Sequence, residues 1–380
     1  MRVLVAAGLL AGCYAPAPPA GAPCVDGMCP TGLVCSLATY TCETTGVDPD
    51  ARVDDDARLD DAATDAPGDG STSPYQYRRR ITIQNNSSSA LAVGFTIRVP
   101  LGATLATLIN DGKVKADLSD LRVIGEGSLG ERNRIVDPAG PTPAAINFSL
   151  AQSIAGNTTS TSYYVYYGRP SASAAPANGN QVFAVYDDFA TAISSIWLKN
   201  DAPVVSNGRL LLRPNRTDAI TTVAASDGVP IVSAVELLAS ISNPLSDPTT
   251  HPEGTFYYWF GYQHTGDFSA SAPWVVWIAR GKTQVHAEQM SPVGCEVNCE
   301  GAYLAQNTAL HYYAIERDPS ATRFYFDGAL SYTATVTNNA DYSLMVRNYQ
   351  ATGDVQVDWI RARIRVTPDP TITIGAEETL

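Results

Sequence analysis

Residues 255–263 read Thr-Phe-Tyr-Tyr-Trp-Phe-Gly-Tyr-Gln (TFYYWFGYQ), an aromatic run with the two-residue side-chain period of a β-strand. Alternation divides the run into two faces, Phe256, Tyr258, Phe260 and Tyr262 on one and Tyr257, Trp259, Gly261 and Gln263 on the other. Because only one face of a strand can enter the core between two packed sheets, we expect the more apolar set inside. The stretch therefore predicts a β-sandwich strand that also carries aromatic rings on its outer face.

Similar short runs, separated by turn residues, cover the chain from residue 75 onward. The first group is expected at 80–84, 95–99, 121–124, 145–150 and 162–167, where no helical period competes. The second is expected at 208–212, 232–240, 255–263, 274–279, 283–289, 311–317, 323–326, 342–347 and 354–366. With 380 residues, 29 Gly, 25 Pro and 19 Tyr, the chain predicts an all-β class with two β-sandwich modules and flanking segments.

The N-terminus has the pattern of an export signal. One basic residue, Arg2, precedes the apolar run 3–11, which is too short to span a bilayer core that needs about 20 residues. The sequence Leu10-Ala11-Gly12-Cys13 resembles the lipobox of bacterial lipoproteins. This resemblance implies cleavage after residue 12 and acylation of Cys13, palmitate included, with a membrane anchor in the cell envelope. Because Tyr14 rather than Asp follows the cysteine, the same resemblance favours the outer membrane, periplasmic or surface-exposed.

The other cysteines predict disulfides. The chain has seven cysteines, and six remain when Cys13 is set aside: Cys24, Cys29, Cys35, Cys42, Cys295 and Cys299. No Cys-x2-Cys spacing occurs and no histidine lies near the first four, so zinc is disfavoured. In an oxidising compartment we expect three disulfides, with Cys295 bonded to Cys299 and the pairing of the first four left open.

An acidic segment follows the first cysteines. Residues 43–74 hold one Glu and nine Asp against two Arg, and so carry −8 of the formal net charge of −13. Such a composition cannot bury enough apolar surface to offset its ordering entropy, so we expect a disordered tether. The acidity of the chain and its export also disfavour nucleic acid as a partner.

Both modules resemble known families. The segments YQYRRRITIQN, SDLRVI and TSYYVYYGRPSA, within 75–183, resemble the bacterial domain of unknown function 2341, which has no assigned chemistry. The segments YDDF, SNGRLLL, HYYAIERDPSATRFYFDGAL and VQVDWIRARI resemble concanavalin A-like lectin/glucanase (LamG-like) sandwiches. We therefore divide the chain into a signal peptide 1–12, an anchored Cys-rich segment 13–45, a linker 46–74, modules at 75–183 and 184–366, and a tail 367–380 that is expected to add an edge strand to the first module.

A candidate binding surface lies on the outer face of the second module. In 283–289, alternation turns Gln284, His286 and Glu288 outward beside the outer set of 255–263. Aromatic rings next to hydrogen-bonding groups suit sugar binding, because a ring stacks on the C–H face of a sugar. The predicted contacts are Tyr257 and Trp259 for stacking and Gln263, Gln284, His286 and Glu288 for polar bonds. The alternative is that these rings are packing covered by loops.

The sequence contains no complete catalytic set. The glucanases of the resembling family carry Glu-x-Asp-x-x-Glu on one strand, and that motif is absent. Glu288 offers one carboxylate, and Glu236 or Glu316 could join it only through the tertiary fold. Four histidines, at 251, 264, 286 and 311, predict neither a metal centre nor a cofactor.

The final arginines alternate with apolar residues. Arg361, Arg363 and Arg365 form a cationic stripe on one strand face, which is expected to be a solvated outer face that discourages edge pairing. Contact with an acidic polysaccharide is the alternative. Together these features favour an envelope-anchored lipoprotein that binds carbohydrate or another surface ligand without catalysis. A glycan-active hydrolase or lyase on the same fold, or a purely structural envelope protein, are the alternatives.

Overall fold

The computed structural model describes residues 73–222, 230, 232–242, 257–263, 273–280, 284–290, 300–305, 307–335, 342–349, 351 and 353–380, with the strand backbone at 33–36 and 41–44. The chain separates into two compact units, Met1–Ala62 and Ala63–Leu380. Cys13, Cys24, Cys29, Cys295 and Cys299 lie outside the described residues. Within the described part, no helix has the length and apolarity needed to cross a bilayer.

The first unit contains one described antiparallel pair, β1 (Leu33–Ser36) and β2 (Thr41–Thr44). Its register places Cys35 directly opposite Cys42. Cα atoms of directly opposed residues are about 4.5–5.5 Å apart, within the range that a disulfide bridges. This backbone register is compatible with a Cys35–Cys42 disulfide, one of the pairings that the sequence left open.

We predict a Cys35–Cys42 disulfide on this basis, which leaves Cys24 for Cys29. Peptide mapping of the unreduced protein should recover one cross-linked fragment that contains residues 35 and 42. Recovery of Cys35 bonded to Cys24 or Cys29 would contradict the register.

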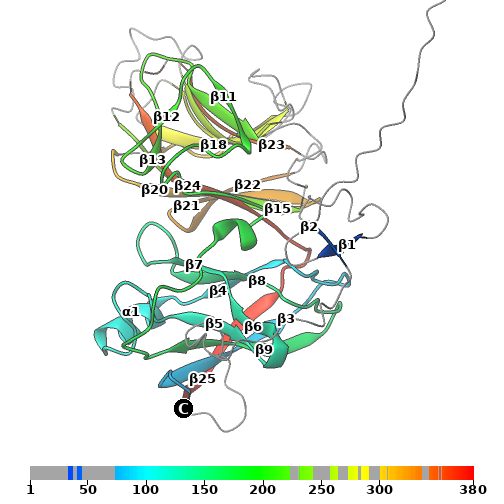
Figure 1. Ribbon diagram of the computed structural model, residues 1–380. Coiled ribbons are helices and arrows are strands. Elements are labelled where there is room, and N and C mark those ends of the chain that lie inside the picture. The colour runs from blue at the N-terminus through cyan, green and yellow to red at the C-terminus, as the bar shows by residue number, and fades with distance from the viewer. Residues whose placement is uncertain are drawn as a thin grey trace, which may run out of the picture. The chain divides into compact units, whose positions relative to one another are not determined.

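The second unit begins with a β-sandwich of two sheets (Figure 1). Its larger sheet has the order β25 (Thr371–Thr379), β3 (Tyr77–Gln84), β9 (Thr159–Tyr167), β5 (Arg122–Gly125) and β6 (Gly130–Arg132). Its smaller sheet has the order β4 (Thr96–Pro100), β8 (Ala145–Ser149) and β7 (Arg134–Asp137). Ile81, Val123 and Phe148 belong to the core between them.

The second sandwich has an eight-stranded and a seven-stranded sheet. The first runs β12 (Val204–Ser206), β13 (Arg209–Leu212), β24 (Val355–Ile364), β15 (Ser233–Ile241), β20 (His311–Arg317), β21 (Ala321–Phe326) and β22 (Ala329–Thr335), with β10 (Val185–Asp187) also on β24. The second runs β11 (Trp197–Asn200), β14 (Ala219–Thr222), β23 (Ser343–Tyr349), β16 (Tyr257–Gln263), β17 (Trp274–Arg280), β18 (Gln284–Met290) and β19 (Leu304–Ala305). The all-β class and the sandwich architecture are thus confirmed.

The last strand returns to the first sandwich. After β24 the chain leaves the second sandwich, and β25 pairs antiparallel with β3, with Ile372 opposite Ile83. In Figure 1 the red β25 lies beside the blue β3. The side chains of Arg78 and Glu378 join the two strands, with Arg78 Nε donating to Glu378 at 2.7 Å. The first sandwich is therefore built from two distant parts of the sequence.

The first module also contains one short helix that the sequence pattern did not reveal. Among the described residues, α1 (Ala103–Asn110) is the one α-helix, and two 3₁₀ turns occupy Gly127–Leu129 and Gly179–Gln181. Helix α1 buries Leu105 and Leu108, three residues apart on one face. A helix this short gives too few repeats to reveal its period in a window of 11–18 residues.

Candidate functional site

The seven-stranded sheet has the alternation that the sequence predicted for β16. Tyr258, Phe260 and Tyr262 belong to the main core of the second sandwich, as do Val285 and Ala287 of β18. Their neighbours along each strand therefore belong to the opposite, outer face. On that face Trp259 of β16 lies opposite Ile278 of β17, and Ile278 lies opposite His286 of β18. The three side chains therefore form one row across the three strands.

This outer face is not an open stacking platform. Trp259 is only 2% exposed, and Gln263, His286 and Glu288 are fully buried. Trp259 packs edge-on against Trp274, with ring centroids 4.9 Å apart, in a separate cluster with Val276 and Ile278. Because a fully packed indole has no face left for a sugar, the expected stacking role of Trp259 needs correction. Tyr257 begins β16, but its side chain is not described, and Gln284 is half-buried at the start of β18.

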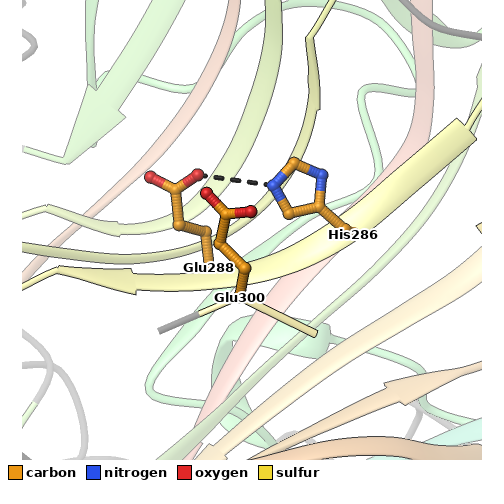
Figure 2. A group of neighbouring side chains, drawn as sticks. All are labelled: His286, Glu288 and Glu300. Atoms are coloured by element: carbon orange, nitrogen blue, oxygen red, sulfur yellow. Dashed lines mark ion pairs between the residues drawn. The ribbon is translucent and has the colours of Figure 1, made fainter. Parts of the chain in front are cut away.

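The same face brings together three potential ligand groups near its edge (Figure 2). His286 and Glu288 lie on β18, and Glu300 pairs with Glu288 through an isolated antiparallel bridge. One ligand atom from each residue lies within 4.8 Å of the other two. The His286 Nε2 atom is 3.4 Å from Glu288 Oε2. The sequence predicted no metal centre, and it missed Glu300 because that residue lies in no recognisable strand.

Aromatic side chains surround this group. Trp274 Nε1 donates a 2.8 Å hydrogen bond to Glu288 Oε1, which holds the carboxylate in one orientation. The ring of Tyr303 lies 4.4 Å from that of His286, and Tyr303 is 41% exposed. Glu300 is exposed as well, so the group extends from the buried face to solvent.

The arginine stripe is neither solvated nor on an edge strand, which corrects the expectation. Strand β24 lies between β13 and β15, and Arg361 is 1% exposed. The two Arg361 Nη atoms donate to both oxygens of Asp137 on β7, at 2.7 and 2.8 Å, and Nε donates to Glu236 at 2.8 Å. Arg363 donates to Glu316 at 3.0 Å. The stripe thus joins the outer face of the eight-stranded sheet to the first sandwich.

The buried carboxylate of Glu236 is held ionised by this network. Burial by itself would raise its pKa, but the nearby guanidinium groups of Arg361, Arg98 and Arg363 outweigh burial and hold the pKa far below 4.5. The unfolded chain regains an ordinary pKa, so the stabilisation from Glu236 is complete above about pH 4.5 and is lost as the pH falls below it.

We therefore expect the free energy of unfolding to fall in acid more steeply in the wild type than in Glu236→Gln. Below about pH 4.5 the difference should approach ~1.4 kcal/mol per pH unit, the value for one proton taken up on unfolding. Urea unfolding at several pH values between 6 and 3 measures both slopes. Parallel slopes would show that Glu236 is not the group that titrates.

A cleft lies beside the network, where the first sandwich meets the eight-stranded sheet. It encloses about 380 Å³ and is lined by residues 135–142 of the first sandwich together with Tyr186, Leu238, Leu310, Asp358, Trp359 and Arg361. This volume is within the range of small-ligand sites, about 300–1,000 Å³. Trp359 is half-buried, and the guanidinium of Arg361 lies 4.3 Å from its ring centroid. Burial, with a contribution from Asp188, raises the pKa of Tyr186 to about 12, so its hydroxyl stays protonated.

The carboxylates that line the cleft are ion-paired. Asp137 binds Arg361 and also Arg98, whose Nη1 lies 2.8 Å from Asp137 Oδ2. Asp358 pairs with Arg209 at 2.8 Å. Both carboxylate side chains are therefore held in place by arginines.

Comparison with known proteins supports part of the sequence interpretation. The family described as Domain of unknown function (DUF2341) matches residues 142–201. The match begins later than the expected 75–183 and continues into β11 of the second sandwich. No curated protein matches the chain.

Solved structures similar to about half of this chain include a β-glucanase, a laminarinase catalytic domain and a carbohydrate recognition domain. The Bacillus licheniformis β-glucanase is 16% identical, with 48% of this chain and 98% of that chain covered and a TM-score of 0.35. The laminarinase catalytic domain from Thermotoga maritima is 12% identical, with coverage of 48% and 98% and a TM-score of 0.38. The Emp46p carbohydrate recognition domain is 10% identical, with coverage of 47% and 94% and a TM-score of 0.34.

Proposed function

We propose that this protein is a lipoprotein of the outer membrane, anchored through Cys13, that binds carbohydrate without cleaving it. The observation that carries the binding role is the cleft of about 380 Å³ between the two sandwiches. The lipobox-like sequence and the acidic segment 43–74 support display of this cleft at the end of a tether.

The lining of the cleft suits a sugar. Trp359 supplies an aromatic ring that is only partly covered, and Leu238 and Leu310 add apolar surface. Tyr186 and Asp358 supply polar groups, of which the Tyr186 hydroxyl can both donate and accept. A mostly apolar concavity with a few polar groups is the usual form of a small-molecule site. This site replaces the platform on the opposite sheet that the sequence favoured.

A glycan array with the purified chain tests the proposal. For any glycan that binds, Trp359→Ala should raise the Kd by about 10-fold or more, because aromatic side chains that a ligand covers carry much of a binding energy. Trp359→Phe retains a ring and should keep most of the affinity. Tyr303→Ala removes an exposed ring outside the cleft and should leave the Kd unchanged.

Circular dichroism and the unfolding midpoint establish whether each variant is folded. The cleft would lose its proposed role if Trp359→Ala were folded and bound as tightly as the wild type. If no glycan bound at any concentration, the structural envelope protein would become the better interpretation.

A hydrolase is the second candidate, and one observation favours it. Oxygen atoms of Glu288 and Glu300 lie within 4.8 Å of each other, and the paired carboxyl groups of retaining glycosidases are about 5–5.5 Å apart. Release of reducing sugar by the wild type, lost in both Glu288→Gln and Glu300→Gln, would support this candidate.

A further inference from the structure

The group of His286, Glu288 and Glu300 contains an unsatisfied imidazole. His286 is fully buried, and neither ring nitrogen has a hydrogen-bond partner among the residues that the structure describes. A buried polar group without a partner is unfavourable, because it has lost its water without replacement. Its Nε2 faces the carboxylate of Glu288, as Figure 2 shows.

The distance between His286 Nε2 and Glu288 Oε2 fits two ligands of one metal ion better than it fits a direct hydrogen bond. Nε2 and Oε2 are 3.4 Å apart, whereas N–H···O bonds span about 2.7–3.2 Å. Two ligands bound tetrahedrally at about 2.0–2.1 Å from one zinc ion lie about 3.3–3.5 Å apart. The observed distance therefore equals the edge of such a tetrahedron.

The surroundings hold two of the three groups in place. Trp274 Nε1 donates its hydrogen bond to Glu288 Oε1, while Glu288 Oε2 lies on the side of His286 Nε2. Metal-binding carboxylates and histidines are commonly oriented by such outer contacts. Glu300 is fixed through its backbone, since the adjacent Gly301 N–H donates to the Ala287 carbonyl at 2.8 Å.

From this geometry we infer that His286, Glu288 and Glu300 bind one divalent transition-metal ion, with Zn²⁺ as the reference ion. One imidazole and two carboxylates form a donor set that zinc accepts. Because Glu300 is exposed, the fourth position faces solvent and can take water or a ligand oxygen. This site lies on the seven-stranded sheet and is independent of the proposed cleft on the eight-stranded sheet.

The test uses the full chain, stripped of metal with a chelator and dialysed. Titration calorimetry with Zn²⁺ should show one binding event that weakens at least 10-fold in Glu300→Gln, whose exposed position protects folding. Glu288→Gln keeps an acceptor for Trp274 and should show the same loss. Glu126→Gln, an exposed substitution in the first sandwich, is the matched control and should bind as the wild type does.

Co²⁺ absorption separates this site from the cysteines. A carboxylate and imidazole site gives weak visible bands, whereas thiolate ligands add a strong sulfur-to-metal band. We expect visible bands that disappear in Glu300→Gln, without the sulfur band. Equal binding by wild type and Glu300→Gln, or a sulfur band as the only signal, would overturn the inference.

Discussion

Replacement of Arg361 by Met is expected to lower the free energy of unfolding by about 3–5 kcal/mol, the usual cost of removing one partner from a buried ion pair. Arg361 is 1% exposed and binds two carboxylates at once, Asp137 through a bidentate pair and Glu236 through Nε. Methionine replaces the apolar stem of the arginine side chain but carries no charge. The substitution therefore leaves the buried carboxylates of Asp137 and Glu236 without the guanidinium that binds both of them. Arg98 is then the remaining positive charge close to both.

Denaturant unfolding of the purified chain, followed by tryptophan fluorescence, measures this loss. Arg209→Met is the matched control, because Arg209 and Asp358 form a pair on the same sheet that is about one-third exposed on each side. Exposed pairs contribute about 0–1 kcal/mol, so the control should change stability little. Equal effects of the two substitutions would show that the network around Arg361 does not hold the sandwiches together.

Cys13→Ser should move nearly all of the protein from the membrane fraction to the soluble fraction. The proposed anchor is the set of acyl chains on Cys13, and two or more chains give stable binding where a single chain does not. The short apolar run 3–11 cannot replace them, since a bilayer core needs about 20 residues. Cell fractionation with immunoblotting measures the distribution.

Cys24→Ser is the control for this substitution, because Cys24 belongs to the predicted disulfide set and not to the lipobox-like sequence. It should remain with the membrane. The lipoprotein proposal fails if Cys13→Ser stays in the membrane fraction to the same extent as the control.

The arginine network also explains how the cleft is positioned. Asp137 lines the cleft and binds Arg361, which itself packs on Trp359. The contact that joins the two sandwiches therefore also orients the proposed stacking ring. Arg361→Met should consequently weaken any ligand of the cleft, and a binding assay on the folded fraction would separate this effect from instability.

Local patterns in the sequence were sufficient for the fold class and for the faces of individual strands. The alternation in β16 and β18 assigned Tyr258 and Val285 to the core and Trp259 and His286 to the other face, as the structure has them. Side-chain direction in a strand depends only on the two-residue period, so it can be read from neighbours in the chain. The presence of β20 at His311–Arg317 follows in the same way.

Only the tertiary structure decided what covers each face and which distant residues meet. Arg361 binds Asp137 across 224 positions, and β25 returns to β3 from the far end of the chain. Burial of Trp259, and the approach of Glu300 to His286 and Glu288, likewise depend on strand pairing and on packing between elements. The alternation of a strand is identical whether its outer face meets water or another sheet. The sequence could therefore identify the two faces, but the long-range packing determined which side chains remain accessible to a ligand.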